Sequence, residues 1–324
     1  MTSWNGRNKM YILGFDIGGT KCAVITAKWD GEKIELLAKR RCETNHGIAP
    51  QEMIAKLIEL AEEIITEKPE RIGISCGGPL DSKKGIIQSP PNLPGWDNVE
   101  IVKQLEEHFG VKTILQNDAN ACAVAEWKFG AGVGTENMVF LTFGTGLGAG
   151  LILNNRLYAG TNDNAGEVGH IRLDKFGPVG YGKAGSFEGF CSGGGIAQLG
   201  YMKALEKVQM GEYPAYFAPG DTQADVTAKR IAEAALAGDE TAKEVYRICG
   251  EYLGRGLSVI IDILNPERIV LGSIFARQED MLRGEMQKVI DKEALAGASA
   301  CCKVVPAALG EQIGDYAAIA TALL

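Results

Sequence analysis

The sequence predicts an α/β protein of two lobes that enclose a central cleft. The chain has 324 residues, of which 46% are hydrophobic and 23% charged, an ordinary globular composition with enough length for two domains. Segments with the alternating period of strands are interspersed with segments of helical period, as is typical of α/β domains. A strand, a glycine turn and a second strand occur at 15–25 and again at 143–153, which indicates that the pattern of the first lobe returns.

The first lobe begins with an antiparallel group of strands and continues as alternating helices and strands. The DIGGT and WDGEK turns have hairpin spacing, and Met53, Leu57 and Ile64 recur at helical spacing. The expected elements are strands over 11–15, 23–27 and 34–38, a helix over 53–64, a strand over 71–75, a helix near 98–109 and a strand over 113–116.

The second lobe is expected to open after a helix over 118–129. Its expected elements are a strand over 138–143, a glycine turn over 144–150, a strand over 151–153 with a hairpin turn, helices between 222 and 264, a strand with a glycine turn over 268–274, and an Ala-rich helix over about 311–324. We therefore assign 1–121 and 305–324 to a smaller α/β lobe, and 122–304 to a larger α/β lobe.

Charge and cysteine usage exclude several classes of protein. The net charge of −8 and the sequence pI of about 5.2 argue against a nucleic-acid or anionic-membrane partner, which would need clustered Lys and Arg. No signal peptide or membrane span is apparent. The eight cysteines include no C-x-x-C pair and lie mostly among apolar residues, so we expect reduced thiols and a cytoplasmic protein.

Two glycine turns are candidates for phosphate binding. Each leaves successive backbone N–H groups unpaired and has no Cβ to hinder an anionic oxygen. One such turn is often only a hairpin, but two matched turns indicate a polyphosphate. Asp16 beside the first turn is a candidate for holding Mg²⁺ through water. The candidate phosphate ligands are Gly18, Gly19, Thr20, Lys21, Gly144, Thr145 and Gly146.

The sequence argues against two other nucleotide-binding folds. The segment GTGLGA at 144–149 fits the G-x-G-x-x-G/A fingerprint of dinucleotide-binding folds. A strand and a hairpin turn follow it, however, where that fingerprint requires a helix. The Walker pattern of P-loop proteins is absent from the sequence.

Asp118 is the candidate catalytic base. Asn117 and Asp118 stand where a strand ends and a helix begins, so Asp118 could simply be a helix N-cap. A carboxylate there could instead accept the proton of an attacking hydroxyl while Mg²⁺ and backbone donors hold a phosphate. The neighbouring glycine turns favour the second role.

Three further polar residues indicate a polyol ligand. Glu167, His170 and Glu188 can each exchange hydrogen bonds with the adjacent hydroxyls of a sugar ring. A lone histidine is more often a surface or capping residue. The accompanying PPNLPGW at 90–96 and GGP at 77–79 make a sugar pocket the better account.

These motifs resemble those of the ROK family of sugar kinases and sugar-responsive repressors. The motifs concerned are DIGGTK at 16–21, PNLPGW at 91–96, NDAN at 117–120, GTGLGAG at 144–150, GEVGH at 166–170 and NPERIVLG at 265–272. They follow family order along nearly the whole chain. The resemblance implies the actin-like ATPase fold shared with hexokinases, with ATP and Mg²⁺ between two lobes and a sugar beneath the γ-phosphate.

The resemblance also implies roles for individual residues. Asp118 would be the catalytic base, and Gly272 would lie near the adenosine. The sugar would be bound by Gly78, Asn92, Asn117, Asp118, Glu167, His170 and Glu188. We thus expect the protein to bind a small-molecule sugar and to form a homodimer. We expect it to bind neither nucleic acid nor a membrane.

The family resemblance is consistent with three functions. The first is an ATP-dependent kinase of the 6-hydroxyl of glucose, and the second is a kinase of N-acetylmannosamine or N-acetylglucosamine, for which the glycines of GGP would leave room beside C2. The third is a sugar-sensing repressor. Such repressors resemble this chain but carry a winged-helix segment before the glycine turn, whereas 15 residues precede Asp16 here, so we expect a kinase.

The chain departs from the family in one segment. Most ROK proteins resemble one another in a CxCGxxGCxE motif, whose cysteines join the histidine of GH to bind a structural zinc. Val179, Tyr181 and Ser186 stand at those positions, and His170 with Cys191 falls short of the four ligands of structural zinc. We expect no zinc site, and a loop over 170–190 held by its glycine turns and by packing of Phe176, Val179, Tyr181 and Phe187.

Overall fold

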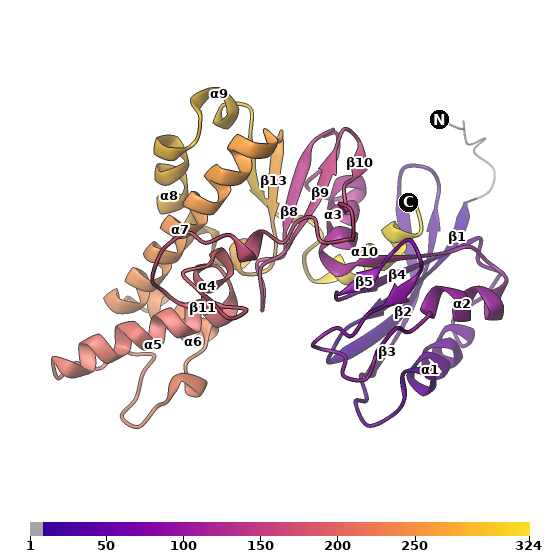
Figure 1. Cartoon of the computed structure of the whole chain (residues 1–324), viewed down its shortest axis with the longest axis horizontal. Coiled ribbons are helices and arrows are strands. Elements are labelled where there is room, and N and C mark those ends of the chain that lie inside the picture. The colour runs from indigo at the N-terminus through magenta and orange to yellow at the C-terminus, as the bar shows by residue number, and fades with distance from the viewer. Residues whose placement is uncertain (1–8) are drawn as a thin grey trace. The chain divides into compact units, whose positions relative to one another are not determined.

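The computed structural model describes residues 9–324, which form two compact units (Figure 1). Unit 1 consists of the described part of Met1–Gly134 together with Gly150–Ala165 and Ala308–Leu324. Unit 2 consists of Thr135–Ala149 and Gly166–Ala307. Within residues 9–324, no helix combines the length and the apolar character that crossing a membrane requires.

Unit 1 is built on a five-stranded mixed sheet with the strand order β3-β2-β1-β4-β7. The first three strands pair antiparallel, and β4 and β7 continue the sheet in parallel with β1. The strands are β1 (Met10–Ile17), β2 (Lys21–Trp29), β3 (Ile34–Glu43), β4 (Arg71–Cys76) and β7 (Thr113–Asn117), and a small hairpin is formed by β5 (Leu80–Asp81) and β6 (Ile86–Ile87).

Helices cover both faces of this sheet because its central strands are apolar on both sides. Alternate residues of β1 point to opposite faces: Leu13 and Phe15 join the core under the first two helices, while Ile12 joins the core under the last helix. Figure 1 shows these helices with α3, which follows β7. They are α1 (Pro50–Glu62), α2 (Ile101–Phe109), α3 (Asp118–Phe129) and α10 (Ile313–Thr321).

The last helix, α10, lies directly on the backbone of β1 and β4. A Cβ placed on Gly73 would lie 2.1 Å from the Ala318 carbonyl oxygen, and one on Gly14 would lie 3.0 Å from the Ala318 Cβ. Glycine at these two strand positions therefore permits an approach that no larger residue would allow. This contact fixes the N-terminal end of α10 near the end of β1.

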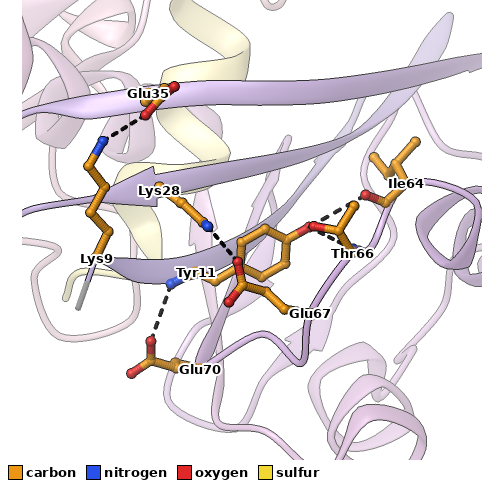
Figure 2. A network of polar contacts seen from close by, with 8 residues as sticks. All are labelled: Lys9, Tyr11, Lys28, Glu35, Ile64, Thr66, Glu67 and Glu70. Carbon is orange, nitrogen blue, oxygen red and sulfur yellow. Dashed lines mark hydrogen bonds and ion pairs between the residues drawn. The ribbon is translucent and has the colours of Figure 1, made fainter.

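A polar network attaches the chain after α1 to the start of the sheet (Figure 2). Tyr11 is 1% exposed, and its hydroxyl accepts a hydrogen bond from the Thr66 backbone N at 3.1 Å and donates to the Ile64 carbonyl at 3.4 Å. The Tyr11 backbone N donates to Glu70 at 3.3 Å. Two ion pairs flank the network, Lys28–Glu67 at 2.6 Å and Lys9–Glu35 at 2.8 Å. The buried phenol thus has its hydrogen bonds satisfied, as burial of a polar group requires.

Unit 2 contains parallel strands and most of the helices. Strand β13 (Arg268–Leu271) pairs in parallel with β8 (Met138–Leu141) and with β14 (Lys303–Pro306). The chain passes from unit 2 to unit 1 at the start of the hairpin formed by β9 (Ala149–Leu153) and β10 (Arg156–Leu157). The helices are α4 (Phe187–Phe190), α5 (Gly193–Gln209), α6 (Ala228–Leu236), α7 (Glu240–Leu264), α8 (Ile274–Glu293) and α9 (Ala296–Ser299), with short 3₁₀ turns η1 (Val168–His170) and η2 (Gln223–Asp225). A third 3₁₀ turn, η3 (Gly310–Gln312), belongs to unit 1.

The expected strands and helices of both lobes occur, with small differences at their ends. Sequence analysis missed the long helices α5 and α8, the short helices α4 and α9, strand β14, and the two-residue strands β5, β6, β11 (Val179–Gly180) and β12 (Lys183–Ala184). All eight cysteines are free thiols, of which Cys301 is exposed and the others are buried or half-buried.

Candidate functional site

The first glycine turn connects β1 to β2 and is closed by backbone contacts. The Gly18 N–H donates to the Lys21 carbonyl at 3.1 Å, and the Thr44 hydroxyl donates to the Gly18 carbonyl at 2.6 Å. A Cβ on Gly19 would lie 2.5 Å from the Asn92 carbonyl oxygen, so only glycine fits there. Within residues 9–324, the N–H groups of Gly19 and Thr20 have no hydrogen-bond acceptor.

Two predicted sugar ligands of unit 1 lie against one pair of glycines. A Cβ on Gly77 would lie 3.2 Å from the Asn92 Nδ2 atom, and one on Gly78 would lie 3.0 Å from the Asn117 Nδ2 atom. The two carboxamides therefore occupy space left by missing side chains at the end of β4. This arrangement presents amide donors and acceptors next to the first glycine turn.

Asp118 begins α3, but the N-cap residue of this helix is Asn117. The Asn117 Oδ1 atom accepts from the Ala119 N–H at 2.9 Å. The Asp118 carboxylate also lies 2.8 Å from that N–H, and its side chain is exposed. Because Asn117 already caps the helix, the cap alone does not account for a carboxylate at position 118.

Asp16 is a half-buried carboxylate at the end of β1, close to other charges. A Cβ on Gly314 would lie 2.7 Å from its Oδ2 atom, which puts the start of α10 against it. Burial and the nearby Asp315 carboxylate raise the pKa of Asp16 to about 6, and Lys39 opposes the shift. Within residues 9–324, the Asp16 carboxylate has neither a hydrogen bond nor an ion pair. A carboxylate without a hydrogen-bond donor or ion-pair partner is suited to bind the water ligands of Mg²⁺, because Mg²⁺ keeps several waters and needs few protein ligands.

The second glycine turn, in unit 2, is closed by backbone contacts and by a side chain. The Gly144 N–H donates to the Gly146 carbonyl at 3.1 Å, and the Gly193 N–H at the start of α5 donates to the Gly144 carbonyl at 2.7 Å. The Glu188 carboxylate accepts from the Leu147 N–H at 3.0 Å. In the part of the chain that the structure describes, the N–H groups of Thr145 and Gly146 have no acceptor.

The predicted sugar ligands of unit 2 gather beside this turn. A Cβ on Gly169, in η1, would lie 3.1 Å from the Glu188 Cβ, so the GEVGH segment and Glu188 adjoin. His170 is half-buried and Glu167 is exposed. Gly272 lies at the end of β13, where its N–H donates to the Leu141 carbonyl at 2.9 Å.

The loop after His170 is held differently from the expectation. The prediction that Phe176, Val179 and Tyr181 pack was wrong, because these side chains are 74%, 44% and 75% exposed, whereas Phe187 is fully buried. The sequence has too few apolar residues here for a local core. The Tyr181 ring instead meets the His170 ring edge-on at 5.2 Å.

Backbone pairing and one glutamine hold this loop. A two-stranded ladder joins β11 (Val179–Gly180) to β12 (Lys183–Ala184). The Gln198 side chain, from α5, accepts from the Val179 N–H at 3.0 Å and donates to the Val179 carbonyl at 2.9 Å. Phe190, just after Glu188, stacks on Tyr252 at 3.5 Å. Within residues 9–324, no cluster of three or more His, Cys, Asp or Glu side chains could hold a metal ion.

Sequence analysis missed one charged pair beside the candidate site. Lys39 forms an ion pair with Asp315, whose side chain is buried. A signal was present, since Asp315 is the one charged residue of the helical segment IGDYAAIAT. A buried charge in such a segment requires an ionic partner.

Comparison with known proteins identifies relatives of two kinds. The sequence is 30% identical to the glucokinase of Thermotoga maritima over 289 residues, covering 87% of this chain and 88% of that protein. The ROK family glucokinase of Streptomyces griseus, solved in complex with glucose and AMPPNP, is 27% identical with a TM-score of 0.75, covering 97% of this chain and 99% of that one. A ROK family transcriptional regulator, a homologue of the Escherichia coli MLC protein, is 26% identical with a TM-score of 0.81, covering 97% and 78%.

These neighbours confirm the predicted actin-like ATPase fold of the α/β class. The glucokinase relatives support a sugar kinase, although repressors are also relatives. The family model described as the ROK family matches residues 12–323, which is nearly the whole described chain. The protein belongs to the ROK family.

Proposed function

We propose that this protein is an ATP-dependent sugar kinase that transfers the γ-phosphate to the 6-hydroxyl of glucose. The observation that carries the proposal is the pair of matched glycine turns. Among the acceptors of residues 9–324, each turn leaves two successive N–H groups unpaired, at Gly19 and Thr20 and at Thr145 and Gly146. Such paired donors suit the oxygens of a polyphosphate.

The reaction would divide among residues already described. Asp118 accepts the proton of the sugar 6-hydroxyl while the oxygen of that hydroxyl forms a bond to the γ-phosphorus. The bond between the γ-phosphorus and the β–γ bridging oxygen breaks, and ADP is released. Bound Mg²⁺ would neutralise phosphate charge, with Asp16 holding its water ligands. Asn92, Asn117, Glu167, His170 and Glu188 would orient the sugar through hydrogen bonds to its hydroxyls.

The relatives support this assignment. A glucokinase is among the sequence relatives, and a related glucokinase structure holds glucose and an ATP analogue. The net charge of −8 argues against DNA binding, which relies on basic residues. We further propose that the protein acts in the cytoplasm as a homodimer.

A second substrate class differs from glucose at C2. The Asn92 and Asn117 carboxamides fill the space beside Gly77 and Gly78, so a group larger than a hydroxyl would fit there only after these carboxamides move. N-acetylmannosamine and N-acetylglucosamine carry such a group at C2. Discrimination between these sugars and glucose depends on whether the pocket forms hydrogen bonds with the substituent at C2.

A coupled ADP-release assay over a hexose panel tests the proposal. Glucose, mannose, N-acetylglucosamine and N-acetylmannosamine are compared at equal concentration with Mg²⁺ and ATP, and the phosphorylated carbon is assigned by NMR. Glucose 6-phosphate as the best product supports the first assignment. A faster release of ADP with an N-acetylhexosamine than with glucose supports the second substrate class. ADP release that does not depend on any sugar would refute a sugar kinase.

A further inference from the structure

Lys39 and Asp315 form a charged pair from distant parts of unit 1. Asp315 is 6% exposed, and its other buried neighbours in α10 are Ala, Ile and Thr residues. Lys39 belongs to β3, 276 positions earlier in the chain. Its ammonium donates to the Asp315 carboxylate.

This pair lies on the same face of the sheet as Asp16. Asp16 is opposite Ala23 on β2, and Ala23 is opposite Arg41 on β3. Lys39 lies two positions before Arg41 and therefore points to that same face. The residue before Asp315 is Gly314, whose Cβ position is 2.7 Å from the Asp16 carboxylate. Two carboxylates, Asp16 and Asp315, thus share one neighbouring ammonium.

The ammonium has two candidate partners and is bound to one of them. The other charged groups that act on Asp16 are Asp118 and Arg41. A partly buried ammonium does not stay unpaired. If Asp315 were neutral, Lys39 would find Asp16 as the next carboxylate on this face.

We propose that Asp315 is a positioning residue that holds Lys39 away from Asp16, so that the Asp16 oxygens remain available to the water ligands of Mg²⁺. The inference rests on the proposed function and adds a residue that none of the expected site motifs contains. It makes Asp315 act through Lys39, without itself touching the metal or the nucleotide.

Three variants separate this role from a purely structural one. In Asp315→Asn, the released Lys39 should neutralise Asp16 and raise the KM for Mg·ATP at least tenfold, with the sugar KM unchanged. The double variant Lys39→Met with Asp315→Asn removes the competing ammonium as well, so the KM for Mg·ATP should return to within threefold of the wild type. Lys39→Arg should retain the pairing and behave like the wild type.

A surface ion pair between strand β2 and the segment after α1 provides the matched control. Glu67→Gln breaks the Lys28–Glu67 pair and should leave the KM for Mg·ATP unchanged. A pair that only stabilises the fold would make the double variant no better than Asp315→Asn. That result, with melting temperatures measured for every variant, would overturn the proposal.

A crystal structure of Asp315→Asn decides the same question without any activity. We expect the Lys39 Nζ atom within hydrogen-bond distance of the Asp16 carboxylate. An Nζ atom in solvent, or still on residue 315, would overturn the proposal. A wild type inactive on every sugar would refute the proposed function, while the position of Lys39 in the variant would still decide the positioning role.

Discussion

The two glycine turns have the same form but are supported in different ways. The first is held by neutral contacts, since the backbone of Asn92 fills the space where Gly19 lacks a side chain. The second is held by a charged side chain, because Glu188 accepts from the Leu147 N–H. The first turn therefore requires a glycine that has no Cβ, whereas the second requires a carboxylate that comes from another part of the sequence.

The largest effect should come from a change that leaves both turns intact. Asp118→Asn keeps the size and hydrogen bonding of the side chain but cannot accept a proton, so kcat should fall about 10³-fold or more. Sugar binding, measured by calorimetry, should change little. Turnover within tenfold of the wild type would remove Asp118 from the role of base.

Alanine substitutions at matched positions of the two turns should destabilise the protein to different extents. Gly19→Ala puts a Cβ 2.5 Å from a backbone oxygen, whereas Gly146→Ala puts one 2.9 Å from the end of the Glu188 side chain. A side chain can move and a backbone cannot. Urea unfolding should therefore show a loss of about 2–3 kcal/mol for Gly19→Ala and less than about 1 kcal/mol for Gly146→Ala. Equal losses would mean that the turns do not differ in this way.

The charge beside the first turn should appear in the pH dependence of stability. The pKa of Asp16 is raised from 3.8 to about 6, so between these values the folded state holds a proton that the unfolded state has released. The free energy of unfolding should therefore fall as pH rises from 4 to 6.

Asp16→Asn removes this titration. In Mg²⁺-free buffer at pH 7.5, the variant should be more stable than the wild type by about 1–2 kcal/mol, below the full value of two pKa units because the site is partly exposed. Asp30→Asn is a control at an exposed hairpin turn. Hydrogen bonds from the Lys33 and Glu32 N–H groups lower the pKa of Asp30, so Asp30→Asn should leave the fall in stability between pH 4 and 6 in place. Parallel pH profiles for Asp16→Asn and the wild type would contradict the assignment.

The smallest effect should come from a zinc chelator, because the loop beside the second turn is expected to hold no zinc. The loop that carries Glu188 is held by Gln198 and by stacking of Phe190 on Tyr252. A strong zinc chelator in excess Mg²⁺ should therefore change neither the melting temperature nor the activity, and elemental analysis should find no stoichiometric zinc. Activity lost to the chelator and restored by zinc would show that a metal supports this loop.

Local pattern was enough to predict most of the fold. The strands of unit 1 and the long helix α7 have clear periods, and the glycine turns stand out against them. Two long helices were missed, each for its own reason. α5 begins with three glycines, Gly193–Gly195, which suggest a turn, and α8 is largely polar, with five buried residues in its twenty. Packing against neighbours, which no local pattern records, stabilises both.

The candidate site was predictable as a set of motifs but not as a set of contacts. The carboxamides of Asn92 and Asn117 were expected, yet their placement on Gly77 and Gly78 depends on how three segments meet. Phe176 and Tyr181 were expected to be buried from their apolar character alone. The pair Lys39–Asp315 joins residues too far apart in sequence for spacing to link them.

The seat of α10 on Gly14 and Gly73 also bears on how the chain is made by the ribosome. The sheet of unit 1 is synthesised early, but the helix that covers one of its apolar faces comes after Gly166–Ala307. At about 5–20 residues per second, that interval lasts roughly 7–28 s. For this time Ile12 and Ile25 have no native cover, so the nascent first unit is a natural client for a chaperone.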